Sequence, residues 1–386
     1  MPGLIIANLL AEEAWAGRSA QPGKATLARL GLSAGLLAVL ARDEADALWI
    51  PAPIPLLDLH FPSAPTSFSP PLVSGGVPRH SPNALLVWAA TDATDRWRPA
   101  PVAASSGTRS RTGIAWLDAL WSLPLVSGQT SRPLASRSWT LALAGRLGLS
   151  LPGARMVADE ADLSAHLSAG GGRASPSGSW VLKAAWSAAG RQRIVVGADG
   201  PSNAQRRWMR TGFMRGDGLL FEPWMSRQAD VGCVAMVDAS GVQILGTHGQ
   251  SIDALGRFQG LTLWPGCRLP AELPQRCLSP ADAKQLEAVV LATGNALAAE
   301  GYAGPFGVDA WSYVDTDGQE RFHPLGEVNV RCTMGLVARA WIERLGLAAD
   351  GRGWRLRFGE PRPADPAAML LVDAGTMGLI WLEPLQ

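Results

Sequence analysis

Carboxylate, amide and guanidinium side chains gather on two predicted strands in the last third of the sequence. Glu327, Asn329 and Arg331 occupy alternate positions, so all three project from one face of a strand. Asp309 lies in an otherwise apolar strand, where an unpaired carboxylate is costly to bury. Mg²⁺ prefers hard oxygen ligands and is usually held by one or two carboxylates together with phosphate oxygens. The sequence therefore predicts a Mg²⁺ or Mn²⁺ site formed by Asp309, Glu327 and the carbonyl oxygen of Asn329.

Cationic and small residues near this predicted metal site suit phosphoryl transfer from a nucleotide. Lys183 closes an apolar strand, where it can neutralise charge on the α- and β-phosphates. The loop that follows has small side chains, which let backbone N–H groups approach phosphate oxygens. This loop contains Ser187, Ala188, Ala189 and Gly190. Arg331 places a positive charge beside the metal ligands, where charge builds up on the transferred phosphoryl group.

Hairpins and helices are predicted around these residues. Alternating apolar patterns and turn residues predict strands at 180–184, 193–196, 219–222, 231–237, 242–246, 306–314, 321–330, 354–358 and within 369–381. Apolar residues at helical spacing predict helices at 25–41, 113–123, 138–147, 281–301 and 334–345. Ser138 is the predicted cap of the third helix, and the Gly/Ser-rich segment 168–179 is predicted to be a flexible surface loop. The fold class expected from this order is α+β, with antiparallel hairpins packed against helices.

The ordered set of lysine, loop, strand end and carboxylates resembles the ATP-grasp superfamily over residues 138–345. This family includes D-alanine–D-alanine ligases, biotin carboxylase and glutathione synthetases. The resemblance implies that two α+β subdomains, 136–222 and 223–386, clasp ATP, and that a separate domain, 1–135, precedes them and contributes to the substrate site. It also implies that a carboxylate is activated as an acyl phosphate and passed to a nucleophile, most often an amine, with release of ADP and phosphate.

The resemblance also implies a role for each matching residue. Lys183 and the 187–190 loop match the phosphate-binding strand and its lid, and Asp309, Glu327 and Asn329 match the metal-binding residues. The hinge, whose backbone contacts adenine in the family, matches Glu222, Pro223, Trp224 and Met225. Asp230 falls where the family places an acidic residue on the ribose hydroxyls, and Arg331 matches the arginine that follows the metal-binding motif.

Three arginine positions differ from the family pattern or leave a choice open. Some members have an arginine two residues before the metal-binding aspartate, where this chain has Gly307. An upstream phosphate-binding lysine is replaced by Arg137, with Arg132 as the alternative. Arg257 is predicted to lie on a loop that covers the γ-phosphate and, with Arg331, to act in catalysis.

Composition and charge limit the classes of molecule that this chain is expected to bind. The chain has 386 residues and a net charge of +1, so no long-range attraction to nucleic acid or to an anionic membrane is expected. No apolar stretch approaches the length of a membrane span, and the N-terminus lacks the features of a signal peptide. Four cysteines without metal spacing suit free thiols in a reducing cytoplasm. We therefore expect a cytoplasmic enzyme that acts on small-molecule or peptide carboxylates and amines, with a homodimer as a possible assembly by analogy.

Two alternatives from other functional classes stay open. Residues 31–35 match the GxSxG pattern of a serine hydrolase with Ser33 as nucleophile, but that motif requires a strand before it, and the preceding residues have a helical pattern. A regulatory protein that binds nucleotide without ligase activity is the second alternative. ADP release in the presence of carboxylates separates an enzyme from such a binding protein.

Overall fold

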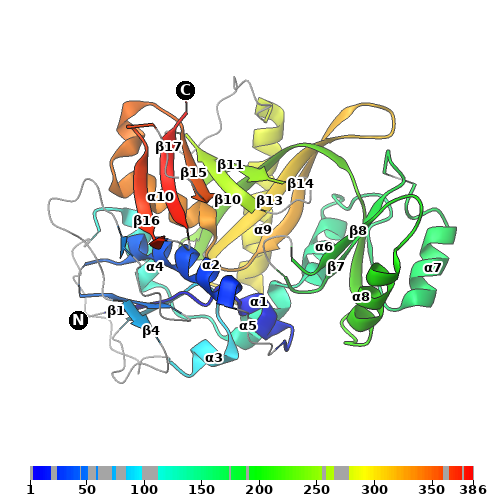
Figure 1. Ribbon diagram of the computed structural model, residues 1–386, viewed down its shortest axis with the longest axis horizontal. Helices are drawn as coiled ribbons and strands as arrows, with labels where there is room; N and C mark the ends of the chain where they lie inside the picture. The colour runs from blue at the N-terminus through cyan, green and yellow to red at the C-terminus, as the bar shows by residue number, and fades with distance from the viewer. Residues whose placement is uncertain are drawn as a thin grey trace.

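The described part of the chain forms three β-sheets in the computed structural model (Figure 1). The structure describes residues 3–18, 24–43, 45–50, 58–59, 72–74, 84–97, 112–173, 175–187, 191–253, 258–264, 278–359, 365–375 and 378–385. Within these residues, helix and strand alternate along the chain, and the expected mixture of helices and antiparallel hairpins is confirmed. No helix in this part of the chain is long and apolar enough to cross a bilayer.

The N-terminal sheet is parallel. In spatial order its strands are β4 (Leu72–Ser74), β2 (Ala47–Ile50), β1 (Gly3–Ile6) and β5 (Ala84–Val87). The helices of this region are α1 (Ala11–Trp15), α2 (Lys24–Gly35), the 3₁₀ helix η1 (Leu36–Leu40), α3 (Asp92–Asp95), α4 (Ala115–Ser122) and α5 (Gly128–Leu134). All four residues of β1 are buried, as expected for a parallel strand covered on both faces. The predicted helices at 25–41 and 113–123 are present, whereas the parallel sheet was not predicted.

The central sheet is antiparallel and carries Lys183. Its strands, in spatial order, are β6 (Arg155–Val157), β9 (Leu219–Pro223), β7 (Trp180–Ala184) and β8 (Arg193–Val196). Helices α6 (Arg137–Arg146), α7 (Glu160–Ser168) and α8 (Asn203–Phe213) accompany it. In Figure 1 this green sheet, with α7 and α8, stands at one side of the molecule, away from the N-terminal sheet. The cap of α6 is Ser136, whose hydroxyl accepts a hydrogen bond from the Trp139 N–H, so the predicted cap at Ser138 is wrong by two residues.

The third sheet has nine strands and holds the predicted metal ligands. In spatial order they are β14 (Glu320–Asn329), β13 (Gly304–Val314), β10 (Ser226–Asp238), β11 (Gly241–Ile252), β12 (Phe258–Leu263), β15 (Trp354–Gly359), β17 (Leu379–Pro384), β16 (Met369–Asp373) and β3 (Asp58–Leu59). Its helices are α9 (Pro280–Ala299), α10 (Met334–Arg344) and the 3₁₀ helix η3 (Leu347–Asp350). Helix α9 packs against β10, β11 and β14, which fixes the strands that carry the site.

One hydrophobic cluster connects the first and the last parts of the chain. It extends from β1 and η1 through α10 to β15 and β17, and the Trp341 indole donates to the Leu36 carbonyl inside it at 3.1 Å. The short strand β3 also pairs with β16. The N-terminal sheet is therefore packed firmly against the C-terminal strands. The division into 1–135, 136–222 and 223–386 stays a prediction.

Candidate active site

Lys183 forms a buried ion pair with Glu222. The two residues lie on neighbouring strands, because Val181 of β7 is opposite Glu222 of β9, and Lys183 is two residues further along the same face. Lys183 Nζ contacts Glu222 Oε2, and the side chains are 7% and 9% exposed. Burial opposes ionisation of Glu222, but the charge and the hydrogen bond of Lys183 outweigh burial and hold the pKa of that carboxyl below its usual range. Burial lowers the pKa of Lys183, and the charge of Glu222 opposes that shift. The direct contact of the two side chains supports a salt bridge of opposite charges.

Asp309 and Glu327 form a second centre, here called the carboxylate pair. They are directly opposite each other on β13 and β14. Burial, together with the negative charge of Glu327, raises the pKa of Asp309 to about 6. Two like charges on one sheet face favour a cation between or beside them. Within the described residues no group of three His, Cys, Asp or Glu side chains forms a metal cluster, so any metal at this point relies on two carboxylates and on amide oxygens.

Gln250 on β11 also reaches the carboxylate pair, which the sequence did not predict. Its Nε2 donates to Asp309 Oδ1 at 2.7 Å, although β10 separates β11 from β13. Gly232 of β10, which is opposite Asp309, makes this reach possible, because a Cβ there would lie 2.8 Å from Gln250 Nε2 and 2.4 Å from His248 Nε2. Nothing in the local sequence distinguishes Gln250 from other polar strand residues, so only the register across three strands identifies it.

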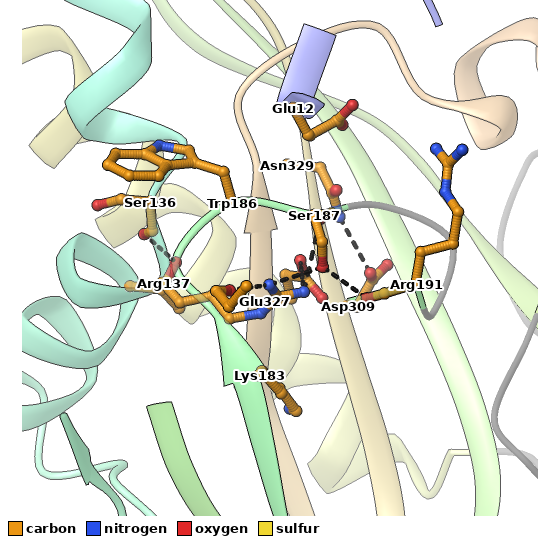
Figure 2. A network of polar contacts seen from close by, with 12 residues as sticks. Glu12, Ser136, Arg137, Lys183, Trp186, Ser187, Arg191, Asp309, Glu327 and Asn329 are labelled. Carbon is orange, nitrogen blue, oxygen red and sulfur yellow. Dashed lines mark hydrogen bonds and ion pairs between the residues drawn. The ribbon is translucent and has the colours of Figure 1, made fainter. Parts of the chain in front are cut away.

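Arg137 connects the central sheet with the carboxylate pair. Its Nη2 donates to Glu327 Oε1 at 2.9 Å, and its Nη1 donates to Ser187 Oγ at 2.9 Å (Figure 2). Ser187 Oγ in turn donates to the Arg191 carbonyl at 2.8 Å. Arg132 instead lies over the Trp186 ring at 4.6 Å. Of the two candidate cations, Arg137 is thus the one that contacts the carboxylate pair.

Arg331 is held by three partners. Its Nη2 donates to Asn329 Oδ1 at 2.9 Å, its Nη1 to the Cys332 carbonyl at 3.0 Å, and its Nε to Glu12 Oε1 at 2.5 Å. Asn329 Nδ2 donates to Asp309 Oδ2 at 3.0 Å. Arg331 therefore orients the amide of Asn329. A carbonyl oxygen has two lone pairs, so Oδ1 can accept from Arg331 and still have one lone pair for a cation.

The two centres open into one pocket. Residues from α6, β9 and β14 line it, including Arg137, Thr140, Glu222, His323 and Glu327. The pocket therefore lies between the central sheet and the nine-stranded sheet. Glu222 of the Lys183–Glu222 pair and Glu327 of the carboxylate pair are both in its wall.

No family model and no curated protein sequence matches the chain. Similar proteins were found only by comparing its fold with solved structures. Biotin carboxylase from Campylobacter jejuni, in a complex with β,γ-ATP, is similar over 99% of this chain and 87% of that chain, with 11% identity and a TM-score of 0.53. N5-carboxyaminoimidazole ribonucleotide synthetase from Thermus thermophilus is similar over 99% and 93%, with 15% identity and a TM-score of 0.52. The chain has the ATP-grasp fold. At these identities the likeness shows the fold alone.

Residues 222–225, which the sequence predicts to be the hinge, lie at the end of β9, and other groups of the protein bond to the backbone of Trp224. The Trp224 N–H donates to the Ser179 carbonyl at 3.0 Å, and Ser175 Oγ donates to the Trp224 carbonyl at 2.7 Å. Ser175, within the segment 168–179 that is predicted to be a flexible surface loop, is buried and bonds to Trp224, whereas the other described residues of 169–179 are exposed or half-buried. Glu222 and Pro223 belong to β9, and Met225 packs with Trp311 and Leu151 in a small apolar cluster.

Asp230, the candidate ribose ligand of the ATP-grasp pattern, is paired in the structure. Its Oδ1 accepts from Arg227 Nη1 at 2.8 Å, and burial raises its pKa above the usual value. Arg227 also lies over the Trp311 ring at 3.7 Å. Of the remaining candidates, Ser187 is in the network of Arg137, whereas Ala188, Ala189, Gly190 and Arg257 lie outside the described residues.

Two sequence features are explained by local packing. Gly307 stands where some ATP-grasp proteins have an arginine, and a Cβ at this position would lie 2.9 Å from Thr333 Cγ2, so a side chain does not fit without displacement. Ser33 lies inside α2 rather than at a strand-to-helix turn. The nucleophile elbow that the hydrolase alternative requires is therefore not formed, and that alternative is wrong.

Proposed function

We propose that this protein is an ADP-forming ligase that uses MgATP to activate a carboxylate as an acyl phosphate and transfers the acyl group to an amine. The observation that carries the proposal is a polar network around one pocket. Arg137 donates to Glu327 of the carboxylate pair. Glu327 and Glu222 both line the pocket, and Glu222 pairs with Lys183. The ATP-grasp fold supports a nucleotide in this cleft, as does the β,γ-ATP complex of the similar biotin carboxylase.

The residues at the carboxylate pair fit a divalent cation. Asp309, Glu327 and the Asn329 carbonyl are hard oxygen donors, which suit Mg²⁺ or Mn²⁺. Burial and then the neighbouring charge of Glu327 raise the pKa of Asp309, so a nearby cation would stabilise its charged form. When bound, the metal neutralises phosphate charge during phosphoryl transfer. Gln250 and Arg331 keep the ligands in place, because each donates a hydrogen bond to one of them.

The cationic side chains fit the nucleotide phosphates. Lys183 and Arg137 lie on the central-sheet side of the cleft, and we propose that both exchange part of their carboxylate contacts for phosphate oxygens. The 187–190 loop is the proposed lid, Glu222 to Met225 the proposed base-binding hinge, and Asp230 the proposed ribose ligand. Arg331 and Arg257 are proposed to act on the transferred phosphoryl group. Carboxylates and amines of amino-acid or peptide type are the proposed substrates.

The test combines ATP binding with ADP release. N-acetyl amino acids serve as carboxylate donors and amino-acid amides as amine acceptors, in all pairs, with ATP binding measured by calorimetry in parallel. We expect Mg²⁺-dependent ATP binding, and ADP release that needs both a donor and an acceptor. ATP binding without carboxylate-dependent ADP release would support the regulatory alternative, and absence of ATP binding would overturn the proposal altogether.

A further inference from the structure

The carboxyl ends of β1 and β5 lie at a switch point of the N-terminal parallel sheet. The sheet order β4-β2-β1-β5 means that the chain leaves β1 toward β2 and β4 and later returns to the other side of β1 with β5. In parallel sheets, ligands bind outside the carboxyl ends of the strands at such a switch point. The loops after the two strands are joined by Asn8, which donates to the Ala89 carbonyl at 2.7 Å and accepts from the Ala89 N–H at 3.2 Å.

The segment that follows β14 contacts the residue that follows β5. The Cys332 N–H donates to the Trp88 carbonyl at 2.8 Å, directly after β5, and the Arg331 guanidinium lies 5.2 Å from the Trp88 ring centroid. Arg331 also pairs with Glu12, which follows β1 on α1. The switch point and the carboxylate pair are therefore linked by one residue, Arg331, which contacts Glu12 on one side and Asn329 on the other.

Glu12 has one carboxylate oxygen that lacks a donor. The residue is 5% exposed, and Oε1 accepts from Arg331, whereas no described residue donates a hydrogen bond to Oε2. A buried carboxylate oxygen without a donor is unfavourable, so the residue is suited to a ligand that supplies an N–H. The adjacent guanidinium disfavours a metal cation, and the negative charge of Glu12 disfavours an anion. A neutral amine meets both conditions, because it has no charge of its own and can donate an N–H to Oε2.

Glu12 and Lys183 lie on opposite sides of the carboxylate pair. Figure 2 shows Glu12 on the same side as Asn329, with Lys183 beyond Glu327 on the other side. A nucleotide held near Lys183 would thus approach the carboxylate pair from one side, and a second substrate held by Glu12 would approach it from the other. This arrangement places the activated carboxylate between its phosphoryl donor and its nucleophile.

We propose that Glu12 is a catalytic residue that binds the attacking amine and accepts its proton, an inference that rests on the proposed ligase function. In this step the amine nitrogen bonds to the acyl carbon while the bond from that carbon to the phosphate oxygen breaks. Inorganic phosphate leaves with the electron pair of that bond. The proton that the nitrogen must lose passes to Oε2 of Glu12, and Arg331 stabilises the carboxylate before the transfer.

The direct test measures binding of a small amine, without turnover. Glycinamide serves as the probe and N-acetylglycinamide, which has no basic amine, as its control, with saturation-transfer NMR in the presence of MgADP. We expect wild type to bind glycinamide but not the acetylated control. Glu12→Gln keeps the shape and an oxygen for Arg331, but it places an NH₂ group at Oε2 and should weaken binding at least about tenfold. Glu13→Gln removes the same charge from the adjacent residue, which pairs with Arg18, and should leave binding unchanged.

Two outcomes would overturn the proposal: equal glycinamide binding to wild type and Glu12→Gln, or no binding of glycinamide to wild type. Glu12→Asp retains a carboxylate and should recover part of the affinity, which separates loss of the acceptor from damage to the fold. Melting curves of each variant give the same control independently. Because this assay needs no ADP release, it can fail while the ligase function stands, and the ligase function can fail while amine binding stands.

A second arm uses the reaction itself, with the donor and acceptor pairs that support ADP release. Glu12→Gln should lower kcat/KM for the amine by about 100-fold, the usual share of a general base. Hydroxylamine, a strong nucleophile at neutral pH, should still trap the acyl phosphate as a hydroxamate at nearly the wild-type rate. Equal losses with amine and with hydroxylamine would show that Glu12 supports acyl-phosphate formation instead, and would overturn its assignment to the amine.

Discussion

The two charged centres of the cleft differ in how their charges are matched. Lys183 and Glu222 are buried together with opposite charges, so this pair is stable without a ligand. Asp309 and Glu327 face each other with like charges, and the pKa of Asp309 rises to about 6 as a result of burial and of that neighbour. Arg137 compensates only Glu327. We call the Lys183–Glu222 pair the complete centre, because its charges cancel and it needs no ligand. We call the carboxylate pair the incomplete centre, because a bound cation would lower the repulsion between its like charges.

The largest effect is expected from removing one charge of the incomplete centre. Glu327→Gln keeps size and hydrogen bonding, but it removes a charge that would face the metal. Turnover should fall by roughly 10³-fold or more, because metal neutralisation of the phosphates is central to phosphoryl transfer. ATP affinity in EDTA should change little. Steady-state ADP release and calorimetry measure the two quantities, and Glu320→Gln, an exposed position on the same strand, is the control. Near-normal turnover in Glu327→Gln would place the metal elsewhere.

Removing one charge of the complete centre should affect stability instead. Lys183→Met leaves Glu222 buried without its partner, which typically costs about 3–5 kcal/mol. The double variant Lys183→Met/Glu222→Gln should recover most of this loss, because no unpaired charge remains. Urea denaturation gives the free energies of unfolding. Lys284→Met, on the exposed face of α9, serves as the control.

The same Lys183→Met variant should also bind ATP more weakly in EDTA, because a cation near the phosphates is gone. An unchanged free energy of unfolding in the single variant would mean that Glu222 becomes protonated at little cost. In that case the contrast between the two centres would be smaller than their charges suggest.

MgATP should stabilise the fold, since it binds the native state only. At a hundredfold excess over Kd the expected gain is about 2.7 kcal/mol. The increase in melting temperature should be larger with Mg²⁺ than with EDTA in wild type, and nearly equal in the two conditions for Asp309→Asn, which lacks one carboxylate of the incomplete centre. A gain in wild type that is the same in EDTA would indicate that nucleotide binding does not involve the carboxylate pair.

Strand and helix patterns made much of this arrangement predictable. The strand at 180–184 and the hairpin around Asp309 and Glu327 follow directly from alternation and turn residues, and the structure has both. The order of the lysine, the loop, the strand end and the carboxylates along the chain was enough to suggest the ATP-grasp fold, because that fold places its site residues on successive strands. The N-terminal parallel sheet was not predicted, since its strands are short apolar runs without alternation.

Contacts between distant segments could not be predicted. Gln250 reaches Asp309 across a strand that has Gly232 at the crossing point, and Glu12 meets Arg331 over 319 positions of sequence. Both contacts depend on how sheets are registered and packed, which periodicity within one segment does not report. The pairing of Lys183 with Glu222 is a similar case, because each was assigned to a ligand and the structure pairs them with each other.

The smallest predicted effect concerns the pKa values of two buried histidines, His323 and His248. Burial lowers the pKa of both His323, beside Glu222 and Lys183, and His248, between Gly232 and Gly335, to about 4. Below the ordinary value of about 6.5, the unfolded state binds protons that the folded state excludes. Stability should therefore fall as pH decreases from about 6.5 to about 4, by at most about 1.4 kcal/mol per pH unit for each histidine. His323→Gln should reduce this slope. In Lys183→Met the negative charge of Glu222 is no longer offset by Lys183, so the pKa of His323 should rise while the pKa of His248 stays unchanged. NMR titration of the ring protons measures both values, and an equal shift of the two histidines would show a general loosening of the fold rather than a charge left unmatched at one centre.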